Sequence, residues 1–253
     1  MELSTEKISE YREKVTERAS KAAGQVSHIP RGRTMPDLEQ MTISETKEFG
    51  MGVVFVDIVQ SGKYLTDNGP RKTMLMLNVF IPQVMDLVND FDGHFEKNTG
   101  DGVLAYFGVE KTERPAVEDL LEYLACLRYV VDEIVNPELQ EYNVPPISIS
   151  VGAAYAQDVY LSRIGVWGQN RLTAVSTAAN VAFELQERAG PDEYLVDEGV
   201  RTFADSEDGW GQHLEKEGVL RGFRWGSSEE GRHTSRYYSF IGGFEQSRSD
   251  ESD

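Results

Sequence analysis

One segment, GMGVVFVDI at residues 50–58, limits the possible folds of this chain more than any other. It is a short, apolar run rich in β-branched residues, which is typical of a strand buried on both faces of a sheet. Its penultimate residue is an aspartate, Asp57. A carboxylate at the rim of a buried sheet costs free energy unless a cation or a hydrogen-bond donor meets it. The segment therefore predicts a central strand with a charged group at its end.

Three later segments have the periodicity of amphipathic helices. Residues 71–89, 115–135 and 173–189 place apolar side chains three and four positions apart, and Gly190 closes the last of them. Residues 59–69 show no such pattern, so we predict a loop there.

The other ordered segments have strand patterns. HFEKNT (94–99) and VLAYFG (103–108) flank a tight GDG centre, which fits a β-hairpin. Four further strand-like segments are ISISVGAAYA (147–156), VYLSRIGV (159–166), part of 193–204 and a terminal hairpin within 218–243. This order predicts an α+β fold with one mainly antiparallel sheet covered by helices.

The two ends of the chain are predicted to lie outside this domain. Residues 1–47 form an N-terminal helical arm, with a helix at 3–23 followed by a linker rich in Gly, Pro and Arg. The apolar face of that helix needs a partner, either its own domain or a second copy of the chain. Residues 48–243 form the domain, and 244–253 an acidic, disordered tail.

Composition excludes several classes of function. The formal net charge is −18, with dispersed Lys and Arg residues, which argues against a nucleic-acid partner. No apolar run is long enough to cross a membrane and the first residues are charged, so we expect a cytoplasmic protein with no membrane contact. Cys126 is the only cysteine, which leaves no disulfide or thiolate zinc site.

Asp57 and Asp101 are the candidate metal ligands. Asp101 lies between two glycines in the hairpin turn, where the backbone allows close approach. If the two strands are neighbours, both carboxylates and the carbonyl of Ile58 offer the hard oxygen ligands that Mg²⁺ or Mn²⁺ prefers. Each motif alone is weak evidence, because GDG is also common in hairpin turns without metal.

Together, four motifs resemble the catalytic domain of class III nucleotidyl cyclases. They are FVDIVQSG, FEKNTGDGVLAYFG, ISVGAAYA and TAVSTAANVAFELQERAG, in matching order over roughly residues 50–190. The resemblance implies a ferredoxin-like class III cyclase fold. It also implies two divalent metal ions, Mn²⁺ or Mg²⁺, held by Asp57, Ile58 and Asp101.

The same resemblance assigns roles to further residues. Ser61 and Gly62 fall in the phosphate-binding loop, Lys97 and Thr173 at the two base-contacting positions, and Asn180 at the asparagine that steadies the ribose. One position departs from the pattern: four residues after Asn180 the family usually has an arginine, and this chain has Glu184. Arg171 is the expected substitute, with Arg163 and Arg188 as rivals.

A further basic residue is expected from the last strands, and three positions compete for that role: Arg221, Arg224 and Arg236. The resemblance implies cyclisation of a nucleoside triphosphate to a 3′,5′-cyclic monophosphate plus pyrophosphate, at sites shared across a homodimer. Within the family the chain looks most like the bacterial Pycsar cyclases, which implies UTP ahead of CTP as substrate and an antiphage signal for a separate effector that senses the cyclic nucleotide. The alternatives are an adenylate cyclase and a degenerate protein that binds a nucleotide without turnover.

Overall fold

The computed structural model describes residues 41–98, 100–221 and 234–244, with a few isolated positions nearer the N-terminus. The predicted N-terminal helix and acidic tail lie almost wholly outside the described residues. The chain divides into two compact units. The larger comprises Gly50–Gln157 and Ser176–Asp253, and the smaller Met1–Phe49 and Asp158–Val175.

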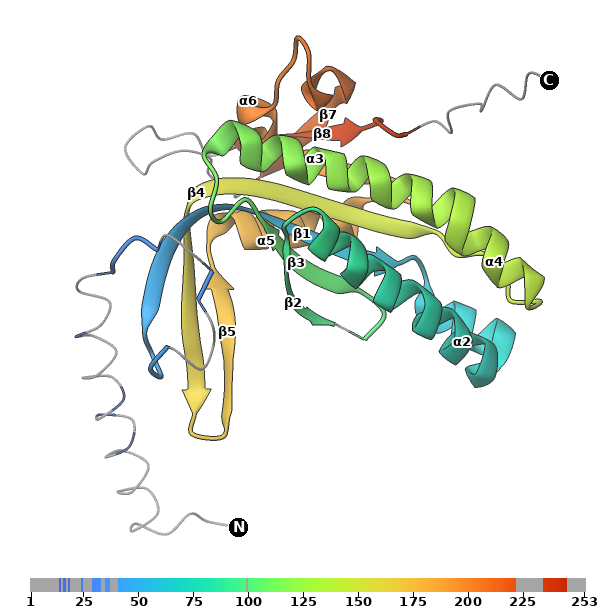
Figure 1. The fold of residues 1–253 in the computed structure, drawn as a ribbon, viewed down its shortest axis with the longest axis horizontal. Coiled ribbons are helices and arrows are strands. Elements are labelled where there is room, and N and C mark those ends of the chain that lie inside the picture. Colours follow the sequence, from blue (N-terminus) through green and yellow to red (C-terminus); the bar gives the residue numbers. More distant parts are fainter. Residues whose placement is uncertain are drawn as a thin grey trace, which may run out of the picture. The chain divides into compact units, whose positions relative to one another are not determined.

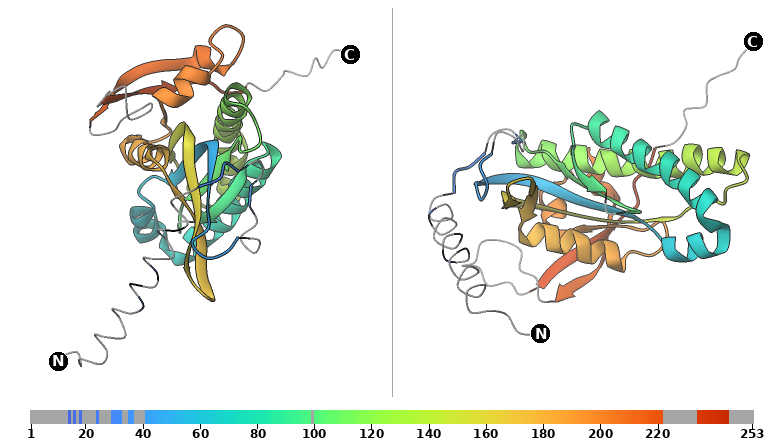
Figure 2. Two further views of the ribbon diagram at one scale, coloured as in Figure 1. Left: turned by 90° about the vertical axis from the view of Figure 1, so that its left-hand side faces the viewer. Right: turned by 90° about the horizontal axis from the view of Figure 1, so that it is seen from below.

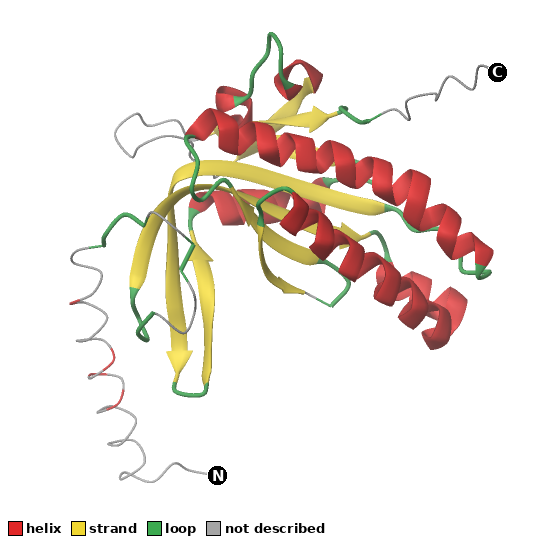
Figure 3. Cartoon of the chain, viewed as in Figure 1, coloured by secondary structure: helices red, strands yellow, loops and turns green. Residues whose placement is uncertain are grey.

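Along the chain, single strands or pairs of consecutive strands are separated by helices (Figures 1 and 3). The strands are β1 (Thr46–Ile58), β2 (His94–Asn98), β3 (Val103–Phe107), β4 (Ile149–Val166), β5 (Gln169–Val175), β6 (Tyr194–Asp197), β7 (Leu214–Arg221) and β8 (Thr234–Phe240). The helices are α2 (Ser61–Asp90), α3 (Glu113–Val130), α4 (Asn136–Glu141), α5 (Thr177–Arg188) and α6 (Glu198–Phe203), with a π-helical turn η2 (Val131–Val135) and a 3-10 turn η3 (Trp210–His213).

The strands follow the order β2-β3-β1-β4-β6-β8-β7, with β5 paired to β4. Five pairs of neighbouring strands run antiparallel, namely β1–β3, β2–β3, β4–β5, β6–β8 and β7–β8, whereas β4 and β6 run parallel. This confirms the predicted mainly antiparallel sheet. In the larger unit, α2 and α3 lie on one face of the sheet and α5 on the other (Figure 2).

Strand β1 sends alternate side chains to the two faces. Val54, Val56 and Ile58 are buried in the main core with apolar residues of α2 and α3. Phe55 points the other way, and its ring meets that of Phe183 on α5 with 5.6 Å between centroids. By the same alternation Asp57 lies on the α5 side of the sheet.

Residues 61–68 are helical, so the predicted loop at 59–69 was wrong. The backbone shows why the pattern was missed: Gly69 (φ 76, ψ 166) breaks α2 directly before Pro70. The short segment before this break, residues 61–68, has too few apolar residues to show the periodicity of an amphipathic helix. Tyr64 connects this segment to a distant part of the chain, because its hydroxyl donates a hydrogen bond to the carbonyl of Pro145 at 2.7 Å.

The start of the third predicted helix was also wrong. Residues 169–175 form strand β5, and α5 begins only at Thr177. The hydroxyl of Ser176 caps this helix by accepting from the backbone N–H of Ala179 at 3.0 Å. The strand-like runs at 147–156 and 159–166 are one continuous strand, β4.

In the smaller unit, β4 and β5 form a hairpin whose register runs from Tyr160 opposite Val175 to Val166 opposite Gln169. Gly168 at its tip has a φ of 75°, which favours glycine. Trp167 beside it is 90% exposed. No helix among the described residues combines the length and the apolar character needed to cross a membrane.

Candidate active site

Asp57 and Asp101 lie together, as the sequence predicts. Val56 pairs with Val103, so the end of β1 lies beside the turn between β2 and β3 that carries Asp101. Gly100 in that turn has a φ of 114°, which an L side chain rarely adopts. Asp57 and Asp101 line the same small cavity, close enough for the charge of Asp101 to raise the pKa of Asp57.

The pair holds more negative charge than its surroundings neutralise. Burial, the charge of Asp101 and the charge of Glu187 together raise the pKa of Asp57 to about 6, against an opposing hydrogen bond from the backbone of Ile58. A bound cation would offset the free-energy cost of ionising Asp57, because a nearby positive charge favours the carboxylate form.

The donor set suits a hard divalent ion shared with a substrate. No group of three His, Cys, Asp or Glu side chains able to hold one ion occurs in the described parts of the chain. Two carboxylates and a main-chain carbonyl such as that of Ile58 would leave coordination positions for phosphate oxygens and water. Mg²⁺ is usually bound in this way, by one or two carboxylates and substrate phosphates.

Ser61 joins the aspartates at the first residue of α2. Its hydroxyl donates a hydrogen bond to the Asp101 carboxylate. Gln60 directly before it adopts a left-handed conformation (φ 54, ψ 40), and the first helical bond runs from the Tyr64 N–H to the Gln60 carbonyl. The N–H groups of the first turn, including that of Gly62, therefore lack helical partners and can bind an anion.

Helix α5 closes the other side of the pair. A small cavity of about 190 Å³ is lined by both aspartates and by Phe55, Val56, Phe183, Gln186 and Glu187. Glu187 is a member of this site that the sequence motifs do not predict. The spacing of four residues between Phe183 and Glu187 places both on one flank, but only the packing of α5 on β1 shows which flank faces the aspartates.

Asn180 and Lys97 belong to the same unit but do not line this cavity. Asn180 lies within α5, as expected from the sequence, and its side chain is exposed. Lys97 follows an irregularity in β2, and its ammonium lies 3.8 Å from the neighbouring Glu96 carboxylate with 42% of the side chain exposed.

The candidates for the missing arginine differ in their surroundings. Arg171 is exposed on β5 of the smaller unit, two positions from Thr173. Arg163, on β4, is held by the side chain of Asn170 at 2.7 Å and by the carbonyl of Met41, which indicates a structural role. Arg188 pairs with Glu184 on α5.

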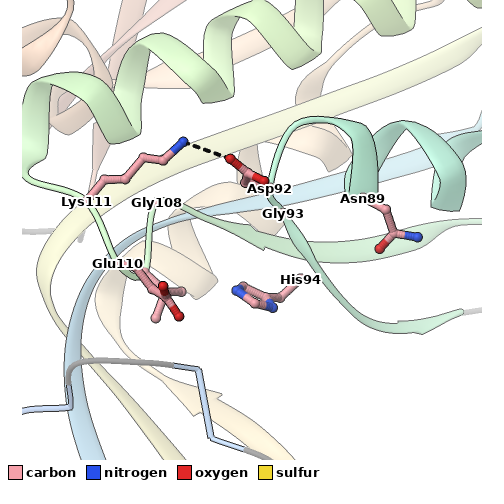
Figure 4. Close-up of a pocket in the computed structure, with 8 residues that line it drawn as sticks. Asn89, Asp92, Gly93, His94, Gly108, Glu110 and Lys111 are labelled. Carbon is pink, nitrogen blue, oxygen red and sulfur yellow. Dashed lines mark hydrogen bonds and ion pairs between the residues drawn. The ribbon is translucent and has the colours of Figure 1, made fainter.

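A second cavity, of about 480 Å³, lies at the opposite end of the β2–β3 hairpin from Asp101 (Figure 4). Lys111 at its edge is paired with Asp92 at 3.2 Å and Asp119 at 2.6 Å. Burial lowers the pKa of His94 there, opposed by the charges of Glu110 and Asp92. None of the predicted site residues lines this cavity.

Comparison with known proteins identifies the fold. No protein-family model matches the chain. It is 27% identical over 179 residues to a cytidylate cyclase of Escherichia coli and 26% identical over 155 residues to one of Staphylococcus aureus. These matches cover 68% and 60% of this chain, which spans only 39% and 37% of the two relatives.

Two solved structures from Pseudomonas aeruginosa are similar in fold. The adenylyl cyclase CyaB gives a TM-score of 0.67 at 15% identity, covering 79% of this chain and 97% of that one. A class III adenylyl cyclase-like ATP-binding protein gives 0.66 at 17% identity, covering 80% and 45%. The chain thus has the class III nucleotidyl cyclase fold, as its motifs predict.

Proposed function

We propose that this chain is a nucleotide cyclase that converts a pyrimidine nucleoside triphosphate to its 3′,5′-cyclic monophosphate and pyrophosphate. The observation that carries the proposal is the Asp57–Asp101 pair at the rim of a class III cyclase sheet. The sequence similarity to two cytidylate cyclases supports a pyrimidine base.

In the proposed reaction the ribose 3′ oxygen attacks the α-phosphorus of the bound triphosphate. A bond forms from that oxygen to phosphorus while the bond from phosphorus to the bridging oxygen breaks. Pyrophosphate leaves with the bonding electrons, and the hydroxyl proton passes to water. No protein nucleophile is needed, so the chain contributes mainly by positioning and by electrostatic stabilisation.

Asp57, Asp101 and the carbonyl of Ile58 would hold two divalent ions. When bound, such ions neutralise phosphate charge and lower the pKa of the attacking hydroxyl. Ser61 orients the Asp101 carboxylate through its hydrogen bond, and the N–H groups at the start of α2, including that of Gly62, would bind phosphate oxygens.

We further propose that two copies of the chain form a homodimer with shared sites. Lys97, Thr173 and Asn180 of one chain would complete the site of the partner's aspartates. Lys97 and Asn180 lie outside the cavity of their own aspartates, which supports this arrangement. A two-fold dimer repeats every such contact, so two equivalent sites result.

The pyrimidine product would act as a second messenger for a separate effector in antiphage defence, as the resemblance to Pycsar cyclases implies. CTP and UTP are both candidate substrates. The names of the two relatives support CTP as the first to test.

One observation favours a second function, nucleotide binding without turnover. Glu184 stands where the family usually has an arginine, and one of the similar structures is that of a cyclase-like ATP-binding protein. Turnover should depend on both aspartates, because they would hold the metal ions. Binding of the nucleotide alone depends less on two metal-binding carboxylates.

The deciding experiment incubates the purified chain with each of ATP, GTP, CTP and UTP plus Mn²⁺ and identifies the products by mass. We expect a cyclic pyrimidine nucleotide that is lost in Asp101→Ala. Cyclic AMP would indicate an adenylate cyclase. No product from any triphosphate, with triphosphate binding retained, would leave only the binding function.

A further inference from the structure

We propose that Arg188 is the cation that stabilises the charge developing on the α-phosphate, and that it acts on the site of the partner subunit. The inference rests on the proposed cyclase activity. It concerns a residue that lies eight positions after Asn180 on the same helix.

Asn180, Glu184 and Arg188 form one row along α5, because residues four apart lie on the same side of a helix. The opposite side of the helix is buried, through Ala178, Val181, Ala182, Leu185 and Gln186. Arg188 is the only Lys or Arg within α5. The exposed row of this helix therefore has a single source of positive charge.

The Arg188 side chain extends back over the preceding turn. Side chains on a helix tilt toward its N-terminus, so a long side chain at 188 covers the position of residue 184. Its Nε and Nη2 both donate to the same oxygen of Glu184, at 3.2 and 3.1 Å. The guanidinium thus lies beside the position where the family usually carries its arginine.

Two contacts fix the guanidinium and leave one edge available. The ring of Tyr237 on β8 lies 5.9 Å from the guanidinium carbon, and Tyr237 itself packs against Gly218, where an added Cβ would come within 2.8 Å of the ring. Nη1 makes no hydrogen bond to any residue described in the structure. The edge formed by Nη1 and Nη2 can therefore receive two phosphate oxygens, which suits the planar fork of arginine.

The two flanks of α5 carry different charged groups, Glu187 on one and the Glu184–Arg188 ion pair on the other. Phe183 and Glu187 lie on the flank that faces Asp57 and Asp101 of the same chain, whereas Arg188 lies on the flank that faces Tyr237. Arg188 is thus directed away from its own aspartates. In a two-fold dimer, the flank of α5 that carries Arg188 in one chain can lie against the aspartate site of the other chain. The symmetry then repeats this contact, so that each aspartate site receives one Arg188.

The alternative is that the Glu184–Arg188 pair only stabilises the helix. An exposed ion pair at this spacing contributes little to stability, so its removal leaves the chain folded. The two roles therefore give different results when turnover is measured.

The test compares Arg188→Gln and Arg188→Lys with the wild-type chain, using the triphosphate that the wild type cyclises and Mn²⁺. We expect kcat to fall about 10²- to 10³-fold in Arg188→Gln with little change in KM, because the interaction strengthens in the transition state. Arg188→Lys should recover part of the loss. The matched control is Arg114→Gln, which removes an exposed arginine of α3 that pairs with Asp205 and should keep wild-type turnover.

A second arm tests the partner relationship. Asp57→Ala and Arg188→Gln chains with different affinity tags are coexpressed, and the heterodimer is isolated. One of its two sites then has both Asp57 and Arg188, so about half of wild-type activity is expected, far above the activity of either variant alone. No recovery would overturn the action across subunits.

Arg188→Gln turnover within about threefold of wild type would overturn the catalytic role, since removing a donor from a developing anion costs far more than that. A wild-type chain that makes no cyclic product would instead overturn the proposed cyclase activity, and this inference with it.

Discussion

Replacing Asp57 by asparagine should stabilise the metal-free chain while abolishing its response to metal. Desolvation and the nearby charges of Asp101 and Glu187 raise the pKa of Asp57 from 3.8 to about 6. A carboxyl whose pKa is raised on folding is destabilising when ionised. The cost is fully present above about pH 6 and disappears as the pH falls toward 4.

The size of the effect follows from the shift. About 2 pKa units correspond to about 3 kcal/mol, which we reduce to about 1.5 kcal/mol because Asp57 is only half-buried and its charge is partly screened. For a chain of this size that is a rise in Tm of about 4 °C. The asparagine amide has the size of the carboxyl group and can donate a hydrogen bond to Asp101, so the substitution removes the charge and leaves a polar group in place.

Thermal unfolding would be followed in EDTA and in Mn²⁺ at pH 7.5 and pH 5. Asp57→Asn should unfold at a higher temperature than wild type in EDTA at pH 7.5, with the gain shrinking at pH 5. Mn²⁺ should stabilise wild type but not the variant. The control Asp67→Asn changes an exposed aspartate on α2 and should match wild type throughout. The reasoning is refuted if Asp57→Asn gains nothing in EDTA or still responds to Mn²⁺.

Three further predictions rest on the described contacts. Mn²⁺ affinity should fall by up to about tenfold per unit below pH 6, because the ion displaces a proton from Asp57, whose pKa is about 6; calorimetric titrations showing no pH dependence would contradict this. Gly152→Ala should lower the unfolding free energy by at least about 2 kcal/mol, because the new Cβ would lie 2.1 Å from the Ala182 carbonyl oxygen, and an unchanged urea midpoint would show that α5 can shift. Arg128→Met should cost about 2 kcal/mol in the same assay, since it removes hydrogen bonds to the carbonyls of Phe240 and Gly242 and the contact with the Tyr194 ring 4.3 Å away; a smaller loss than for Arg114→Gln would contradict that estimate.

The sequence predicts those parts of the fold that depend on local rules. The apolar strand ending at Asp57 and the GDG turn that carries Asp101 are both encoded within a few residues, and their proximity follows once the two strands are neighbours. The stripe at 71–89 likewise matches the second part of α2. These elements can be predicted without knowing which residues pack against them from other parts of the chain.

The errors occur where a distant contact decides the structure. Residues 173–175 continue the small and apolar pattern of α5 toward the N-terminus, but they form the end of β5 because they pair with β4. Residues 61–68 have too few apolar positions to indicate a helix, and the Tyr64 hydrogen bond to Pro145 supports them from 81 residues away. Pattern within a window contains no information on such partners.

The residues of the site likewise fall into those that local motifs predict and those that depend on distant packing. Asp57, Asp101 and Ser61 could be named from their motifs, and the structure brings them into contact. Glu187 could not be named, because its approach to Asp57 depends on the angle at which α5 crosses the sheet. The roles of Lys97, Thr173, Asn180 and Arg171 depend on a second chain and stay predictions.

The close approach of α5 to the sheet at Gly152 makes this helix a fixed platform. The backbone of β4 lies against the backbone of α5 at Ala182 and Gln186, and no side chain between them can be shortened or repacked. Substitutions on the outer row of the helix should therefore change which groups meet a substrate without moving the helix itself. Single replacements on this row can therefore separate the proposed roles of Asn180 and Arg188 from the stability of the fold.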